Sequence, residues 1–164
     1  GAVFLLALLA IAFTRPGSIR DFSIYGVDLV TSKKSVLNQW NLSPHQRPLD
    51  DHLFFVGKGS EEIETLFTFS GLYLVSGREL EVRGQTLTAG ISRKSVQSRL
   101  GHPSSVCQMP IYGPQFSEEE YLYPNQFGIP SIAVIVLYRG DTAEKFTLYR
   151  VYRTAELLIS QLFR

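Results

Sequence analysis

The stretch ISRKSVQSRLGHPSSV, Ile91 to Val106, repeats the pattern of an earlier stretch, VTSKKSVLNQWNLSP, Val30 to Pro44. In both, a Ser is followed by two basic residues, a second Ser and a Val, then by an apolar residue four positions on and soon after by a Pro. A Ser in front of such a run is a favoured helix N-cap, because its hydroxyl can accept a hydrogen bond from the first turn. The pattern therefore predicts two short helices, KKSVLNQW and RKSVQSRL, and its repetition indicates a duplicated unit.

Strand-like sequence follows each predicted helix. HLFFVG, ETLFTFSG, LYLVSG and RELEVRGQTL come after the first helix, and EEYLYP, SIAVIVLYRG and EKFTLYRVYR come after the second. Aromatic and β-branched residues bounded by Gly are typical of antiparallel strands. We therefore predict an α+β fold of two tandem repeats, residues 22–87 and 88–153, each a helix plus an antiparallel meander, which could share one sheet. Residues 154–164 are predicted to form a closing amphipathic helix.

An unbroken apolar run opens the sequence, GAVFLLALLAIAF, and ends at Thr14-Arg15-Pro16. This run is shorter than the roughly 20 apolar residues that a membrane-spanning helix needs. We expect a transmembrane anchor over residues 1–14 that continues upstream, followed by a juxtamembrane linker over residues 15–21. An uncleaved signal sequence and a buried core helix are the alternatives. The residues expected to contact lipid are Phe4, Leu5, Leu8, Leu9 and Phe13.

Composition and charge exclude several functions. The formal net charge is +1, with basic and acidic residues mixed along the chain, which is not the charge pattern of a nucleic-acid-binding protein. The single Cys107 excludes an intrachain disulfide and any multi-cysteine metal site. No GxSxG motif is present, and the three His residues have no recognisable Ser or Cys partner spacing. We therefore expect no catalytic residue and no bound cofactor.

Two further clusters have a plainer explanation than chemistry. His102, Cys107 and Met109 are soft metal ligands, but their spacing fits no metal site, so a loop Cys and a packed Met are expected. The adjacent acids at 118–120 are expected to be solvated, because general acid–base catalysis needs carboxyls in unlike, partly buried environments. No metal ligand is predicted.

The long segment from His102 to Pro130 has the composition of a binding loop. It contains five prolines, which lower the cost of ordering a loop, and a set of aromatic residues, which commonly anchor interfaces. A connection of this length without secondary structure is usually functional or disordered. The alternative is that these aromatics only cover the core from outside. The predicted partner-binding residues are Tyr112, Phe116, Tyr121, Tyr123 and Phe127.

Both predicted helices begin with cations, which the helix macrodipole disfavours by roughly a few tenths of a kcal/mol each. Exposed helix ends tolerate this cost, which is one explanation. Contact with anionic lipid or with an acidic patch of a partner is the other. The residues concerned are Lys33, Lys34, Arg93 and Lys94.

The second copy, with the strands EEYLYP and IAVIVLYRG behind it, resembles the small repeat of the outer-membrane assembly lipoproteins, the BamE-like or SmpA-like domain. In tandem form it is similar to the β-lactamase inhibitor proteins. Those families place a capped helix ending in Leu-Gly-x-Pro, here Leu100 to Pro103, before a β-meander. The resemblance covers about residues 22 to 153, although the first copy has Trp40-Asn41 in place of Leu-Gly. It implies a non-catalytic scaffold outside the cytoplasm that binds another protein through its sheet or loops.

These features together predict a non-catalytic, single-pass membrane accessory or assembly subunit with an extracytoplasmic, periplasmic domain. We expect it to bind and stabilise a multi-subunit membrane complex, whether respiratory, photosynthetic or envelope-assembling. The expected partners are integral membrane subunits and the lipid bilayer, and not nucleic acid. The alternative is a tethered or secreted inhibitor or ligand-binding module of the β-lactamase-inhibitor type. An enzyme is a third option, which a buried pocket with a perturbed His or carboxylate would indicate.

Overall fold

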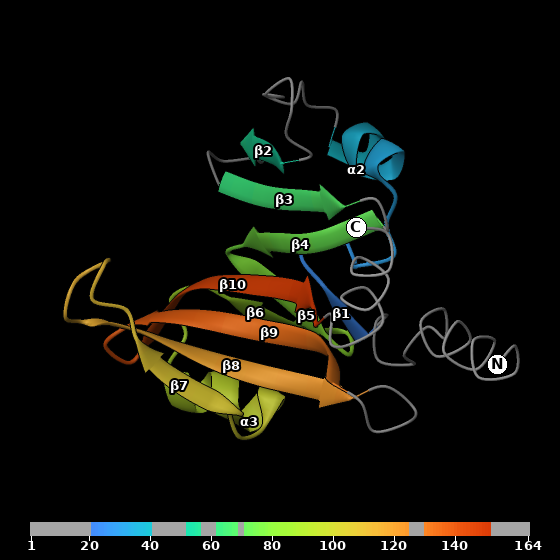
Figure 1. Ribbon diagram of the computed structural model, residues 1–164. Coiled ribbons are helices and arrows are strands. Elements are labelled where there is room, and N and C mark those ends of the chain that lie inside the picture. The colour runs from blue at the N-terminus through green and yellow to red at the C-terminus, as the bar shows by residue number, and fades with distance from the viewer. Residues whose placement is uncertain (1–20, 41–51, 57–61, 69–70, 125–129, 152–164) are drawn as a thin grey trace, which may run out of the picture.

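The computed structural model describes residues 21–40, 52–56, 62–68, 71–124 and 130–151 (Figure 1). These residues form two sheets and two helices, and every strand pairing is antiparallel. The large sheet contains, in spatial order, β2 (His52–Val56), β3 (Glu62–Thr68), β4 (Gly71–Gly77), β10 (Thr142–Arg150), β9 (Pro130–Arg139), β8 (Phe116–Pro124) and β7 (Ser105–Gln108). The small sheet contains β1 (Phe22–Ser23), β5 (Glu79–Val82) and β6 (Gln85–Thr88), and the helices are α2 (Lys33–Trp40) and α3 (Arg93–Leu100).

The large sheet joins two meanders into one surface. In the chain, β2, β3 and β4 follow α2, whereas β8, β9 and β10 follow α3 and β7. The last strands of the two meanders pair with each other, with Gly77 of β4 opposite Phe146 of β10. The short strands β2 and β7 therefore lie at the two outer edges of the sheet (Figure 1).

The two helices begin with the same local structure. In α2 the backbone N–H of Ser35 donates to Ser32 Oγ at 3.1 Å, and in α3 the backbone N–H of Ser95 donates to Ser92 Oγ at 3.3 Å. The two hydroxyls of each pair also lie 2.9 Å apart. Each Ser satisfies a donor that the first turn of a helix leaves unpaired, which explains why both stretches start a helix at the same point of the pattern.

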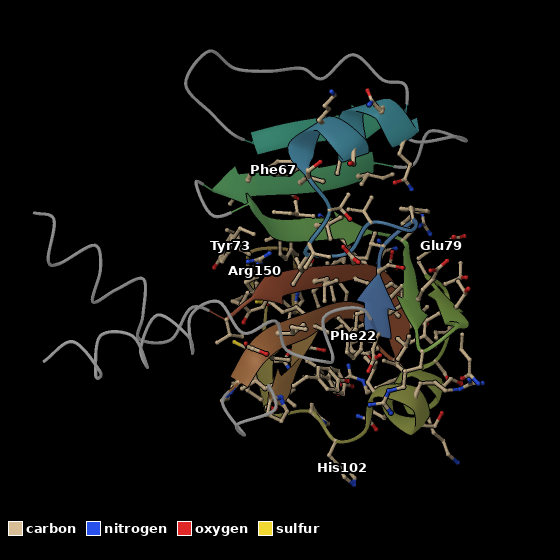
Figure 2. All side chains as sticks on the ribbon, turned by 90° about the vertical axis from the view of Figure 1, so that its right-hand side faces the viewer. Phe22, Phe67, Tyr73, Glu79, His102 and Arg150 are labelled. Carbon is tan, nitrogen blue, oxygen red and sulfur yellow. The ribbon has the colours of Figure 1, made fainter. Side chains whose placement is uncertain are left out.

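One face of the large sheet is buried against the small sheet and α3, which lie behind it in Figure 1 and to its right in Figure 2. Alternate residues of a strand point to the same face, and on β9 those facing the core are Ile132, Val134, Val136 and Tyr138, all fully buried. This core face gathers the largest apolar side chains of both sheets. The small sheet contributes Phe22, Leu80, Val82 and Leu87, and the helices contribute Val36, Val96 and Leu100.

The opposite face of the large sheet is turned toward the viewer in Figure 1, and we call it the open face. Leu74 of β4, Tyr149 of β10 and Ile135 and Leu137 of β9 point to it and are half-buried. Among the described elements, neither a helix nor a strand lies over this face in either view.

The predicted α+β class is wrong, because strands dominate the described residues. The two helices within those residues have eight residues each, and the second is ended by Gly101 in a left-handed conformation. The long strands β3, β8, β9 and β10 largely alternate buried and more exposed positions, with the period of a strand. In addition, residues 79–88 leave the first meander and pair with β1, with Phe22 opposite Val82, to make the second sheet.

The predicted transmembrane helix is overturned as well. No helix in the described part of the chain is long and apolar enough to cross a bilayer, since a span needs about 20 residues. This finding contradicts the single-pass membrane prediction and the membrane location that followed from it. The stretches 1–14 and 154–164 lie outside the described residues, as does linker 15–21 except for its last residue. The same is true of the expected lipid-contacting residues Phe4, Leu5, Leu8, Leu9 and Phe13.

Candidate functional site

Exposed apolar side chains gather on one arm of the molecule. Within the described residues three large hydrophobic side chains are exposed, namely those of Val106 (57 %), Ile111 (83 %) and Tyr112 (57 %). All three lie on β7 or on the turn that joins β7 to β8, and this turn projects beyond the sheet at the left of Figure 1. A contiguous patch of solvent-exposed apolar side chains commonly marks an interaction site. We call residues 105–116 the projecting arm.

The turn of the projecting arm is well supported by hydrogen bonds. The backbone N–H of Met109 donates to the carbonyl of Phe116 at 3.0 Å, and that of Tyr112 donates to the carbonyl of Met109 at 3.0 Å. Gly113 has φ +121°, a conformation that L side chains rarely adopt. The backbone therefore holds the tip of the arm in one shape.

The aromatic rings of the arm are also held in place. The rings of Tyr112 and Phe116 meet edge-on with centroids 6.1 Å apart, and the guanidinium of Arg139 lies over the Phe116 ring at 5.2 Å. Contacts of these two kinds are favourable by roughly 0.5–1.5 kcal/mol each. A surface ordered before binding loses less entropy when a partner arrives.

β7 gives the arm a free strand edge. It pairs with β8 on one side, and no described strand pairs with its other side. Because the N–H of Met109 points toward β8, the alternation of an antiparallel ladder turns the N–H and C=O groups of Val106 and Gln108 outward. All four residues of β7 are exposed. A row of outward N–H and C=O groups is a template for another strand.

Beside this edge, β8 carries two carboxylates on the open face. Glu118 lies opposite Cys107, and Glu120 lies opposite Ser105, whose hydroxyl donates to Glu120 Oε2 at 3.2 Å. The Tyr149 hydroxyl donates to Glu120 Oε1. Burial raises the pKa of Glu118 above its ordinary value. Neither carboxylate has a described Lys or Arg within ion-pair distance.

Glu119, between them, faces the core, where it binds Arg93. It is 2 % exposed, and its Oε1 accepts from Arg93 Nη1 at 2.9 Å and from Gln97 Nε2 at 3.0 Å. The Tyr121 hydroxyl donates to Oε2 at 2.5 Å. Arg93 Nη2 in turn donates to Ser117 Oγ at 2.8 Å. The expectation of a solvated acidic run is therefore wrong at this position, and the contact fastens α3 to β8 at the base of the arm.

Burial in this cluster changes the chemistry of its tyrosines. It raises the pKa of Tyr121, and the hydrogen bond to Glu119 raises the pKa further. The pKa of Tyr138 is also raised, mainly by burial, and its ring lies under the Arg93 guanidinium at 4.3 Å. Both phenols therefore stay neutral near pH 7. The cluster carries a compensated ion pair inside the protein, which is the arrangement of a structural contact.

The predicted aromatic set divides between the arm and the core. Tyr112 and Phe116 lie on the projecting arm, whereas Tyr121 is 1 % exposed. Tyr123 is half-buried, its hydroxyl donates to the Leu100 carbonyl at 3.0 Å, and its ring contacts that of Phe22. Tyr121 and Tyr123 thus serve packing on the core face of β8. Phe127 lies outside the described residues.

The predicted cationic set is likewise divided. Lys34 and Lys94 are exposed in the first turns of α2 and α3. Arg93 is bound to Glu119 and Ser117 and is not available to lipid or to an acidic partner. The side chain of Lys33 lies outside the described part of the structure.

A shallow pocket of about 240 Å³ lies on the open face where β10 ends. The residues that line it are Tyr73, Glu120, Leu122, Pro130, Tyr149, Arg150 and Val151. The pocket is open to solvent and mixes aromatic, apolar and charged groups.

His102, Cys107 and Met109 are soft metal ligands that lie close together in the sequence. No group of three or more His, Cys, Asp and Glu residues in the described ranges could hold a metal ion. Cys107 is exposed on β7, and its thiol donates to the Gln108 carbonyl at 3.4 Å.

The partner-binding residues predicted from the sequence did not include Val106, Ile111 or the two acids on the open face, Glu118 and Glu120. For Val106 the signal was its place in a short stretch bounded by Pro103 and Pro110, because prolines limit an edge strand to a few residues. Ile111 follows Pro110 and had no such signal. Comparisons with protein-family models, with curated proteins and with solved structures found no match for this chain.

Proposed function

We propose that this chain is a non-catalytic protein-binding module that acts through its projecting arm. The observation that carries the proposal is the gathering of Val106, Ile111 and Tyr112, the three exposed large hydrophobic residues of the described structure, on this one arm. A few residues, often aromatic, carry most of the binding energy of an interface, and a contiguous exposed apolar patch commonly marks such a site.

The base of the arm is built to keep it in place. Arg93 and Glu119 fix α3 to β8, and Arg139 packs over the ring of Phe116 where the arm leaves the sheet. A binding element on a rigid scaffold presents its contacts with little loss of entropy. Arg93 and Glu119 would therefore support binding by holding the arm in place, and not by catalysing a reaction.

The resemblance to the BamE-like repeat and to the β-lactamase inhibitor proteins agrees with a binding role. In the structure α2 precedes the meander β2-β3-β4 and α3 precedes the meander β7-β8-β9-β10, and the two meanders meet at β4 and β10. We propose that the chain serves as an accessory subunit of a larger protein assembly. Inhibition of an enzyme is the second candidate, favoured by the projection of the turn, because a convex arm fits a concave cleft.

A site-specific crosslinking experiment tests the proposal. A photo-crosslinking amino acid is placed at Ile111 in the full chain, in its native cells, and a matched probe is placed at Gln85, an exposed position on β6. We expect a discrete adduct from position 111 that is missing from position 85. Equal labelling at both positions, or no discrete adduct at 111, would contradict a binding role for the arm. An enzyme as the captured partner, with activity lost on adding the purified chain, would favour inhibition.

A further inference from the structure

We infer that the partner binds as an added β-strand along β7, and that its segment alternates basic and apolar residues. This inference rests on the proposed function and names the partner chemistry that the same arm would recognise. Three features of the arm lead to it, namely the backbone edge, the charges on one side of that edge and the apolar surface on the other.

The backbone edge determines how the partner lies. The N–H and C=O groups of Val106 and Gln108 point away from β8, so an extended segment can pair with them in the way a further strand would. Pro103 and Pro110 flank this edge and lack the N–H groups needed to lengthen it. The paired segment is therefore short, and its side chains must supply much of the affinity.

On the open face, the side chains of β7 leave a path to the acids of β8. Ser105 and Cys107 point to this face and are small, and Glu120 and Glu118 lie directly behind them. An added strand would lie about 10 Å from β8, two strand spacings away. A Lys or Arg on it can reach across Ser105 or Cys107 to a carboxylate that has no described cation partner.

On the other face the arm offers apolar surface. Val106 points there and is 57 % exposed, and its neighbour across the ladder is Glu119, whose charge is already matched by Arg93. An apolar side chain on the added strand would cover Val106. Successive residues of a strand point to opposite faces. The paired segment of the partner should therefore have a basic, an apolar and a basic residue at three consecutive positions.

Synthetic peptides can test this pattern. The probe is a short peptide that alternates Lys and Val, and the control is a peptide of the same composition with all Lys before all Val. We expect the alternating peptide to bind the full chain more tightly than the block peptide, measured by fluorescence anisotropy. N-methylation of the peptide backbone at the positions that pair should abolish the difference. Equal affinity for the two peptides would overturn the inference, because charge alone would then explain binding.

Protein variants assign the site. The double variant Glu118→Gln/Glu120→Gln should weaken binding of the alternating peptide about fivefold or more at low salt, whereas Glu79→Gln on the small sheet should leave it unchanged. In hydrogen exchange, the peptide should slow the amides of Val106 and Gln108. A discrete crosslink from position 111 with no slowing of these amides by the captured partner would leave the binding function standing and reject strand addition.

Discussion

Arg93 Nη1 donates to Glu119 Oε1 across 2.9 Å, and this contact joins the first turn of α3 to β8 at the base of the projecting arm. The carboxylate is 2 % exposed, so removing the cation would leave a buried charge without compensation. Arg93→Ala should therefore lower the free energy of unfolding by about 3 kcal/mol. Urea unfolding at pH 7 measures the change. Lys94→Ala, one residue on and exposed, should change it by less than about 0.5 kcal/mol. Equal effects of the two variants would mean that the ion pair contributes nothing.

The same contact shows which parts of the fold were accessible from sequence. The Ser-capped helices follow from local hydrogen bonding, and the structure has helices over the predicted residues, Lys33–Trp40 and Arg93–Leu100. The burial of Glu119 depends on which face of β8 is covered, and that is decided by the docking of a helix 26 residues away in the chain. Strand alternation alone puts residues 119, 121 and 123 on one face but does not say that this face is the core.

The second sheet could not be predicted from the sequence for the same reason. Its pairing of Phe22 with Val82 joins positions far apart in the sequence. No local pattern distinguishes a hairpin that continues a meander from one that leaves it. The α+β prediction failed there. It also failed because the described residues contain only two turns of helix after each cap, against ten strands.

Gly77 marks the place where β4 leaves the large sheet toward β5. A Cβ at this position would lie 2.6 Å from Tyr25 Cε2 and 3.0 Å from Ile24 Cγ2. Gly77→Ala should therefore destabilise the fold by about 1–3 kcal/mol, because the neighbouring side chains must shift. Thermal unfolding measures it, with Thr88→Ala on exposed β6 as the control. An unchanged melting temperature in Gly77→Ala would show that the side chains around position 77 move aside without loss of stability.

Stability should fall in alkaline solution because of the buried tyrosines. Burial raises the pKa of Tyr123 to about 12, and it raises the pKa of Tyr121 and of Tyr138 as well. The stabilisation is fully present below about pH 10, where an unfolded tyrosine is still neutral, and it is lost as pH rises toward the folded pKa. Urea unfolding at pH 9 and pH 11 should show this loss. Tyr123→Phe should show a smaller loss, and Tyr112→Phe, at an exposed position, should behave as the unaltered protein does.

Ile111 should affect binding and not stability. Its side chain is 83 % exposed, so Ile111→Ser removes few intramolecular contacts and should change the free energy of unfolding by less than about 0.5 kcal/mol. The discrete crosslink of the arm, read from a probe at Tyr112, should weaken in this variant. Persistence of the crosslink at full yield would show that the partner does not contact the tip of the turn.

Substitution of Glu118 should have opposite effects on stability and on binding. Burial raises the pKa of its carboxyl, so the folded protein favours the protonated form, and the stability that this supplies at acid pH is lost as pH rises through the folded pKa. At pH 7, Glu118→Gln should therefore stabilise the fold slightly, by less than about 1 kcal/mol because the side chain is partly exposed. Glu64→Gln, on the same face but paired with Lys145 at 3.1 Å, should give no such gain.

The alternating peptide should bind the more stable Glu118→Gln variant less tightly. A carboxylate kept at a cost in stability, where Gln would fold better, is what a binding site for a cationic partner requires. If Glu118→Gln lowers stability and leaves peptide affinity unchanged, the acid belongs to the fold and not to the binding edge.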